Sequence, residues 1–535
     1  MSAATPSPDD EAVIRSPATS SFCEPAARPW VLATTILASS MVFIDGTVTN
    51  VALPALQLEF NASAADVQWV IESYALLLAA LLLVGGSAGD RFGRRRVFAI
   101  GVGLFAIASL WCGIAGSVDM LIYARAVQGV GGALLVPGSL ALISASFPED
   151  IRGKAIGTWS GYTAITTALG PVIGGFLIEH LSWRYIFFIN LPLALAVLVL
   201  TFRYVPESRN TQAPARLDWP GAVFVSVALG GLVYALVEAP SRTWKDPAVA
   251  GALGLSVVAL AAFVLAETRH PSPMLPFALF RSWNFSGANL LTLFLYAALG
   301  GSLFFLPLNL IQVQAYSAMA AGAALLPFIL TMFILSRWAG GLVDRYGARR
   351  PLMIGPAIAA CGFALFAVPA VGGSYWTTFF PAALVLGLGM AISVAPLTTT
   401  VMNALEKDLA GVASGINNAV SRVAALVAIA LFGIVMTQAF NAELLRRTRQ
   451  LTLPPATLQQ VLAQRHKLAA IELPDQSTPA EKTAMKTAID HAFVAGFRRV
   501  MLLSALLALA SAASTWLLID RRRRAPADHP GHGAG

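Results

Sequence analysis

The sequence predicts an all-α integral membrane protein, and three observations support this fold class. Apolar residues make up 57% of the 535 residues and charged residues only 12%, about half of the roughly 25% that soluble domains carry. The mean hydropathy is +0.69. The apolar residues form stretches of about 20 residues, the length that crosses a bilayer as a helix. So little charge cannot cover a water-facing surface, which excludes a soluble enzyme, a nucleic-acid-binding protein and a disordered chain.

Fourteen such stretches are expected to form transmembrane helices. Helices rather than strands follow because each segment has to satisfy its own backbone hydrogen bonds in lipid. The expected spans are 30–53, 67–88, 97–115, 119–146, 155–178, 185–203, 218–238, 247–266, 285–311, 318–342, 351–371, 376–400, 411–438 and 498–519.

The positions of Lys and Arg predict the orientation, because cytoplasmic loops carry an excess of them. With both termini in the cytoplasm, 21 fall inside and 3 in the short outside loops. Segment 1–29 is then a disordered cytoplasmic tail and 521–535 a basic one. The outside loop 439–497 holds 9 more, but loops of about 60 residues escape the rule. We expect a multi-pass protein of the plasma (inner) membrane.

The long outside loop 439–497 has helix signals of its own. Thr478 at the N-cap, Pro479 at the first helical position and Glu481 at the third predict a helix that begins near 479 and runs into the last span. A second short helix is expected near 455–471. A mobile linker is the alternative.

An internal repeat divides the chain. The loop Gly86–Arg96 after the second span aligns with Gly340–Arg350 after the tenth at a constant offset of 254 residues. We therefore expect an N-terminal six-helix bundle over 30–217, two inserted helices with a linker over 218–283, and a C-terminal six-helix bundle over 284–520. Parallel repeats of this kind place a substrate site between the two bundles at mid-membrane.

Five motifs together resemble the fourteen-helix drug:proton antiporter branch of the major facilitator superfamily, over nearly the whole of residues 30–520. They are DGTVTNVALP (Asp45–Pro54), GDRFGRRR (Gly89–Arg96), RAVQGVGG (Arg125–Gly132), GPVIGG (Gly170–Gly175) and WRYIFFINLP (Trp183–Pro192). The resemblance implies the major facilitator fold. It also implies proton-coupled efflux of amphipathic or cationic organic compounds by alternating access.

Two of the motifs have roles that the resemblance implies. The loop after the second span acts in the family as a cytoplasmic latch between the halves. Gly93 allows a tight turn with positive φ, and Gly86 and Gly89 are expected to let helices approach closely. The latch residues here are Gly86, Asp90, Arg91, Gly93, Arg94 and Arg95, with Asp344, Arg345 and Gly347 in the second copy, where Ala348 replaces an expected basic residue. Anchoring by positive charge is the alternative. The antiporter motif Gly170, Pro171, Gly174 and Gly175 seals the family's cavity against leak, and its glycines permit close packing.

Charged residues inside the spans are functional candidates, because a charge in the membrane is costly. At 1.5 Å per residue, Asp45, Arg125 and Glu72 lie at similar depth in the outer half of the first six-helix copy. We expect Asp45 to carry the proton, Arg125 to be its charge partner and Glu72 to be a second acid. Gln128 and Arg422 complete the expected proton-coupling and substrate site. A static ion pair that orients the helices is the alternative.

Other function classes have weaker support. An importer or facilitator of a polar metabolite shares the fold, but the antiporter motif and the intramembrane acids argue against it. An integral-membrane enzyme or receptor would need a nucleophile, a metal cluster or a large soluble domain. The six His residues lie outside the spans, the three Cys residues show no metal spacing, and no phosphate-binding P-loop occurs. We therefore expect no catalytic or metal-binding residues and no cofactor besides the proton gradient. The expected partners are a small organic substrate, protons and the bilayer, and no nucleic acid. Whether an adaptor or outer-membrane protein also binds is left open by the sequence.

Overall fold

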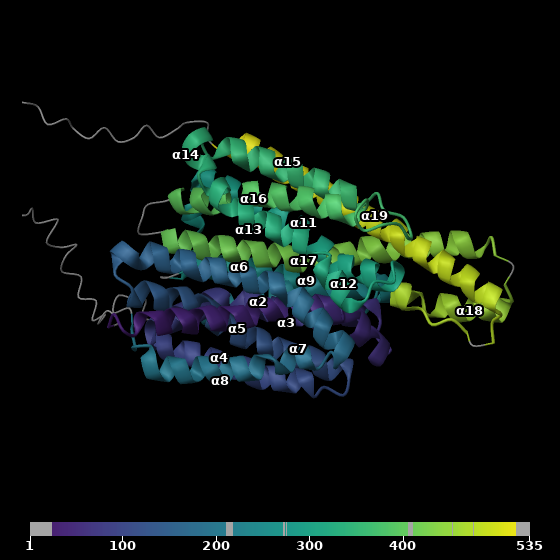
Figure 1. Cartoon of the computed structure of the whole chain (residues 1–535), viewed down its shortest axis with the longest axis horizontal. Helices are drawn as coiled ribbons and strands as arrows, with labels where there is room; N and C mark the ends of the chain where they lie inside the picture. The colour runs from purple at the N-terminus through teal and green to yellow at the C-terminus, as the bar shows by residue number, and fades with distance from the viewer. Residues whose placement is uncertain are drawn as a thin grey trace, which may run out of the picture.

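The computed structural model describes residues 24–209, 218–270, 273, 275–404, 410–451, 453–474 and 476–519, and within these it contains helices but no strand (Figure 1). The helices are α2 (Arg28–Glu59), α3 (Ala64–Phe92), α4 (Arg94–Gly113), α5 (Val118–Ser146), α6 (Glu149–His180), α7 (Tyr185–Phe188), α8 (Asn190–Tyr204), α9 (Trp219–Arg242), α10 (Pro247–Arg269), η1 (Phe277–Arg281), α11 (Trp283–Leu308), η2 (Asn309–Val313), α12 (Ala318–Ala323), α13 (Leu326–Gly340), α14 (Leu342–Tyr346), α15 (Arg349–Phe366), α16 (Phe379–Asn403), α17 (Ala410–Thr448), α18 (Pro455–Ala463), η4 (Arg465–Ala470) and α19 (Pro479–Leu518).

Helices α2 to α8 pack together as one bundle. α5 lies against α3, α4 and α2, while α2 also contacts α6 and α8. Local signals start these helices where the structure has them. Ser63 caps α3, and with Asp66 it forms a capping box that satisfies exposed backbone N–H groups. Ser117 likewise accepts the N–H of Met120 at the start of α5.

Helices α11 to α17 and α19 form the second bundle, in which α11 packs against α17 and α19, and α16 packs against α13 and α15. The predicted tenth span is interrupted here. α12 ends at Ala323, and α13 begins with a proline in its first turn, at Pro327. Proline has no backbone N–H to donate, so it favours a new helix start at this point.

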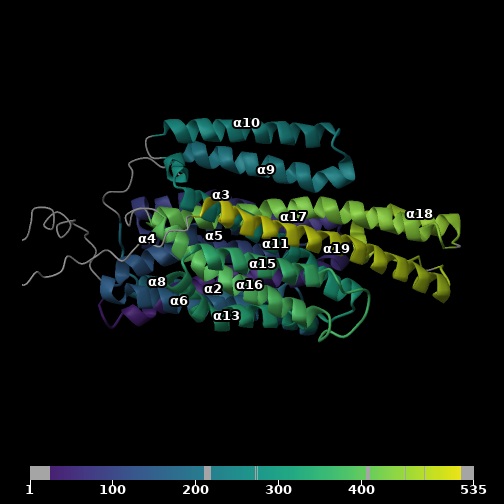
Figure 2. The ribbon, with the colours of Figure 1, turned by 90° about the horizontal axis from the view of Figure 1, so that it is seen from above.

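The inserted helices α9 and α10 pair with each other at the edge of the molecule, on the side away from α13 (Figure 2). α9 contacts α3 of the first bundle and α17 of the second. It therefore lies over the seam between the bundles, with α10 on its outer side. The boundaries of the three predicted domains remain our interpretation.

Twelve helices of the described residues are long and apolar enough to cross a membrane. α6 and α15 coincide with predicted spans but are not among the twelve. The predicted number of fourteen is compatible with the structure and stays a prediction.

The predicted helices of the 439–497 loop are present. α19 starts at Pro479, and Thr478 and Glu481 form the expected capping box. α18 and η4 occupy the position of the predicted short helix. With the ends of α17 and α19 they extend beyond the other helices at one end of the molecule, which we call the cap end (Figure 1).

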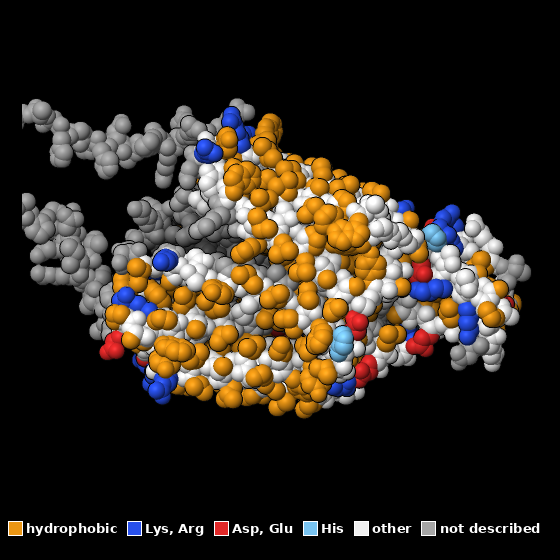
Figure 3. Space-filling view, in the orientation of Figure 1, with side chains coloured by type: hydrophobic (Ala, Val, Ile, Leu, Met, Phe, Trp, Pro, Cys, Tyr) orange, Lys and Arg blue, Asp and Glu red, His pale blue; other side chains and the backbone are white. Residues whose placement is uncertain are grey.

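The opposite end, which we call the basic end, carries the two repeated loops with Arg94–Arg96 and Arg349–Arg350. The two bundles touch at the cap end. There the side-chain amide of Gln57 donates to the carbonyl of Lys467 at 3.0 Å, and that of Gln312 donates to Gln57 Oε1 at 2.8 Å. At the basic end the surface is hollowed between the bundles (Figure 3).

Candidate functional site

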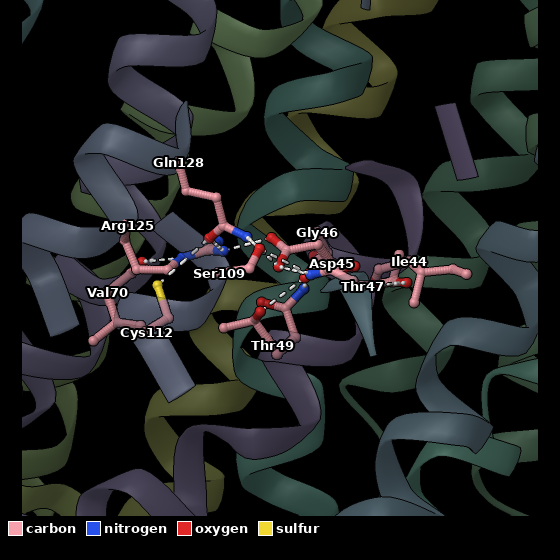
Figure 4. A network of polar contacts seen from close by, with 12 residues as sticks. Ile44, Asp45, Gly46, Thr47, Thr49, Val70, Ser109, Cys112, Arg125 and Gln128 are labelled. Atoms are coloured by element: carbon pink, nitrogen blue, oxygen red, sulfur yellow. Dashed lines mark hydrogen bonds and ion pairs between the residues drawn. The ribbon is translucent and has the colours of Figure 1, made fainter. Parts of the chain in front are cut away.

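The predicted pair of Asp45 on α2 and Arg125 on α5 forms inside the first bundle (Figure 4). Both side chains have an exposed fraction of 0%. Nη1 of Arg125 donates to Asp45 Oδ2, and Nε donates to the carbonyl of Val70 on α3 at 3.1 Å. Burying either charge alone would cost free energy, and the attraction between the two opposite charges offsets part of that cost.

Three neutral side chains complete the surroundings of Asp45. Gln128, one turn along α5 from Arg125, donates to Asp45 Oδ1 at 2.8 Å and accepts from Arg125 Nη1 at 2.6 Å. Asn190 at the start of α8 donates to the same Oδ1 at 3.3 Å. Ser109 on α4 accepts from both amides, at 2.9 and 3.3 Å. Side chains of α5 and α8 thus bind the carboxylate directly, and Ser109 of α4 holds the two amides in place.

Aromatic rings enclose the guanidinium of Arg125. Its centre lies 4.1 Å from the ring of Tyr74 on α3 and 5.8 Å from the ring of Phe187 on α7. Ring faces attract cations, and the attraction is stronger away from water. Nη2 of Arg125, Oδ1 of Asn190 and the hydroxyl of Tyr74 are buried and lack a hydrogen-bond partner among the described residues. The network therefore keeps unused hydrogen-bonding capacity beside its ion pair.

The sequence analysis missed Ser109, Asn190 and Tyr74 as parts of this site. Asn190 stands in the quoted WRYIFFINLP motif, and each of the three is a polar group within an apolar span. A polar residue within an apolar span is a candidate for the site, but the sequence does not show which side of the helix that residue faces.

The predicted second acid, Glu72, is buried but lies apart from this network. It is two residues from both Val70 and Tyr74 along α3, and such neighbours point to nearly opposite sides of a helix. Its exposed fraction is 0%, and neither carboxyl oxygen has a hydrogen-bond partner among the described residues. An unpaired carboxylate in such a place is costly, so the neutral form is favoured.

Arg422 lies on α17 in the second bundle and is half-buried. Its Nε donates to Asn418 Oδ1 at 3.1 Å, one turn earlier. Within the described part of the chain no acid pairs with it, and its electrostatic neighbour is Tyr74 across the seam. Arg422 is therefore a cation in the membrane-spanning region that faces the other bundle without a counter-charge.

The antiporter motif fits the predicted close packing. A Cβ on Gly170 or Gly174 would overlap Thr47 or Val48 of α2, only two or three residues from Asp45. Pro171 lies inside α6, and its carbonyl leaves no room for a Cβ on Gly322 of α12. A Cβ on Gly175 would likewise overlap the backbone of Met319, only 2.5 Å from its Cα. The motif thus joins the Asp45 helix to the second bundle at the cap end.

In the first basic loop, Gly93 has the predicted positive φ, 110°. Asp90 pairs with Arg94 one turn later at 2.8 Å, so this acid is bound within its own loop. Glu207, which follows α8 and was missed from the sequence, lies beside the loop: its Oε1 accepts the backbone N–H of Arg95 at 3.1 Å, and Oε2 is 3.6 Å from Arg96 Nε.

One detail of the first loop was wrong. Gly86 was expected to let helices approach closely, but a Cβ there would meet Pro137 at an ordinary 3.6 Å. The tight approach of α3 to α5 occurs one residue earlier, where a Cβ on Gly85 would overlap the carbonyl of Ala133. Gly89 also has room, with its nearest neighbour at 3.9 Å.

The second loop copy repeats the turn of the first, with φ of 75° at Gly347. In this copy the side chain of Asp344 lies outside what the structure describes, and Arg345 is exposed. In the first copy, the guanidinium of Arg91 lies over the ring of Phe92, 5.3 Å from its centroid. The predicted latch between the halves stays a prediction. In the described residues, no three His, Cys, Asp or Glu side chains gather as metal ligands would.

Two helical bundles, with a buried ion pair inside one and, in the other, an arginine that has no acid partner among the described residues, define a membrane transporter of the repeat-built kind. The chain belongs to the Major Facilitator Superfamily, whose family model matches residues 35–429. Its relatives place it in the drug:proton antiporter branch of that superfamily.

Three of these relatives are proteins of drug resistance. The tetracenomycin C resistance and export protein of Streptomyces glaucescens is 32% identical over 94% of both chains. The puromycin resistance protein pur8 of Streptomyces alboniger is 35% identical over 98% of this chain and 97% of its own. The multidrug resistance protein Stp of Mycobacterium tuberculosis is 35% identical over 82% of this chain and 80% of its own.

Solved structures agree on the fold. A bacterial homologue of the human lysosomal transporter Spinster, in an inward-facing and unoccupied conformation, aligns over 92% of this chain and 98% of its own, with a TM-score of 0.63 and 17% identity. An auto-inhibited peptide transporter of the POT family aligns over 95% of this chain and 99% of its own, with a TM-score of 0.61 and 12% identity.

Proposed function

We propose that this protein exports amphipathic or cationic organic compounds across the membrane in exchange for protons. The observation that carries the proposal is the buried pair of Asp45 and Arg125, with Gln128 binding both partners. Relatives that resemble nearly the whole chain are resistance and export proteins, which supports efflux over import. The family consists of transporters, so we assign no catalytic residue.

Antiport requires that the proton and the substrate exclude each other, and Asp45 offers a means. A proton on Asp45 removes the negative charge that Arg125, Gln128 and Asn190 bind. The pair then loses its electrostatic attraction, and a cationic substrate loses the charge that would attract it. Ionised Asp45 favours the substrate instead. In this scheme Glu72 is a second protonation site, and Arg422 faces the substrate from the other bundle.

Alternating access follows from the positions of the contacts. We propose that the basic end is cytoplasmic, as the excess of Lys and Arg indicates. The hollow at that end then faces the cytoplasm, and the contacts of Gly175 and Gly322 close the outer side. During transport the outer contacts break, and the two basic loops come together as the latch. Import of a polar metabolite has no comparable support.

The test uses the purified protein in proteoliposomes. An inward-acid pH gradient should drive uptake of the cationic dye ethidium, and Asp45→Asn should lower the initial rate about 100-fold, to background. Asp119→Asn is the matched control: it is the same substitution at an exposed position in the first turn of α5, and should transport like the wild type. Uptake that ignores the gradient would contradict antiport.

The substrate is identified by a separate screen. An efflux-deficient bacterial host that expresses this chain should tolerate higher concentrations of some compounds in an antibiotic panel. The Asp45→Asn variant should remove that tolerance. Equal tolerance of the two strains would show that resistance does not depend on this carboxyl.

A further inference from the structure

Glu72 occupies a seam formed by three parts of the molecule. It lies between Trp69 and Leu76 on one face of α3, three and four residues away. These neighbours pack into an apolar cluster with α9 and α17. Its buried members are Val233, Leu236, Val237, Leu426 and Ala430. The carboxyl without partners is therefore surrounded by hydrocarbon from the first bundle, the second bundle and the inserted pair.

The register of α9 against α3 places an aliphatic side chain level with Glu72. Trp69 Nε1 donates to Glu238 Oε1 at 3.2 Å, and a Cβ on Gly230 would contact Leu76 at 3.6 Å. The two helices run antiparallel between these contacts. Glu72 then lies level with Tyr234 and Ala235 of α9. Val233, less than half a turn away, belongs to the apolar cluster and has an exposed fraction of 0%.

The register of α17 gives the same result on the other side. Gln68 Nε2 donates to the carbonyl of Ile429 at 3.4 Å, and a Cβ on Gly415 would contact Leu83 at 3.6 Å. Glu72 lies level with Leu426, which is also fully buried. α17 therefore closes the seam that α9 covers.

The charged and titratable groups that face this seam are bound elsewhere. On α9, Glu238 accepts from Trp69 and pairs with Arg242 at 3.1 Å. Tyr234 packs beside the ring of Trp69, with centroids 6.2 Å apart. On α17, Arg422 interacts with Asn418 and Tyr74, the other titratable group of α3 at this depth. In the described residues none of these groups forms an ion pair or hydrogen bond with Glu72.

We propose that the inserted helix pair, with α3 and α17, encloses Glu72 in a proton-binding chamber. In the observed state the chamber is closed, and the carboxyl keeps its proton because no group compensates its charge. Movement of α17 along α3 and α9 during alternating access admits water and releases the proton. The inference rests on the proposed function and gives α9 a role in coupling.

The test is infrared spectroscopy of the full-length protein in lipid, because a protonated carboxyl and a carboxylate absorb at different frequencies. At neutral pH the wild type should show a protonated carboxyl band that Glu72→Gln removes and Asp45→Asn leaves. Val233→Asn, which places a hydrogen-bond donor on α9 less than half a turn from the level of Glu72, should lower the proton affinity of this carboxyl about tenfold. Val223→Asn, on the same helix but with an exposed fraction of 55%, should leave it unchanged.

Each outcome decides the proposal. A missing band, or a titration that Val233→Asn does not move, overturns it. If Val233→Asn does not fold, Val233→Thr replaces one methyl group by a hydroxyl at nearly constant volume and should shift the titration in the same direction. A titration that Val233→Thr does not shift would also overturn the proposal. Ethidium uptake is measured on the same samples. Failure of wild-type uptake would contradict the proposed antiport, while the band would still report on the chamber.

Discussion

The two bundles carry the same loop motif but place different chemistry at their centres. In the first bundle, Asp45 and Arg125 are fully buried and bind each other. In the second, Arg422 is half-buried and binds the neutral side chain of Asn418. A neutral network lies beside it, where Asn417 donates to Asn289 at 3.1 Å and to Thr292 at 2.7 Å.

This difference separates two tasks. A compensated pair inside one bundle can change its charge by one proton without moving the helices apart. A cation at the seam, with no acid partner among the described residues, interacts electrostatically with a substrate that enters between the bundles. We infer that the first bundle holds the proton site and the second contributes to the substrate site.

The strongest test of this division replaces each arginine by glutamine. Arg125→Gln leaves a buried acid without its partner, which should cost about 3–5 kcal/mol of unfolding free energy at neutral pH. Arg422→Gln removes a charge that no acid compensates in the described residues, so the cost should stay within about 1 kcal/mol. Unfolding by detergent titration in mixed micelles measures both.

The pH of that titration is the control. Acid protonates Asp45 and removes the unpaired charge that Arg125→Gln creates, so the difference between the two variants should shrink as the pH falls. Equal losses for the two variants at neutral pH would mean that the two arginines have equivalent surroundings.

The second test concerns the contact between the bundles. Gly322 of α12 has no room for a Cβ against the carbonyl of Pro171. Gly322→Ala should therefore hold the cap end apart, with a cost of about 1–3 kcal/mol to the observed state. Gly340→Ala is the matched control in the same bundle, because its surroundings are open. Disulfide trapping between cysteines introduced at Phe176 and Met319 should become slower in Gly322→Ala alone.

The site also shows how far a sequence can be interpreted. The meeting of Asp45 and Arg125 was predicted from depth, because a helix rises by a fixed 1.5 Å per residue. Which face each helix turns inward was not predicted, since most spans are apolar all round. Ser109, Asn190 and Tyr74 were missed for that reason, and the close approach was assigned to Gly86 instead of Gly85.

Glu207 was missed for a different reason. It follows α8 in an irregular segment, where neither helical period nor depth applies. Its contact with the first loop brings together residues about 110 positions apart, a pairing that no local pattern contains. By contrast, the helix after Thr478 was predicted, because a capping box is made only of neighbours in sequence.

The third test compares the two loop copies. Glu207→Gln removes the acid beside Arg95 and Arg96, and partly exposed ion pairs of this kind contribute about 0–1 kcal/mol. In the second copy Arg349 binds the carbonyl of Trp516 instead. Salt should therefore weaken the stability of the wild-type first loop more than that of Glu207→Gln, in which only the pair of Asp90 and Arg94 is left to screen. Hydrogen exchange of Arg94–Arg96 measures this, and an equal salt response in both proteins would be the contrary result.

The last comparison, also on the scale of about 1 kcal/mol, concerns the two capping boxes at the cap end. Ser63 begins α3 and Thr478 begins α19, and each accepts the N–H of an acid three residues later, at 3.1 and 3.3 Å. Either change to alanine should cost about 1 kcal/mol of helix stability. Ser63 starts a helix whose other end carries the first basic loop, whereas Thr478 starts a segment that extends beyond the bundles. Ser63→Ala should therefore lower both stability and ethidium uptake, and Thr478→Ala stability alone. If Thr478→Ala slows uptake equally, the extension at the cap end takes part in transport.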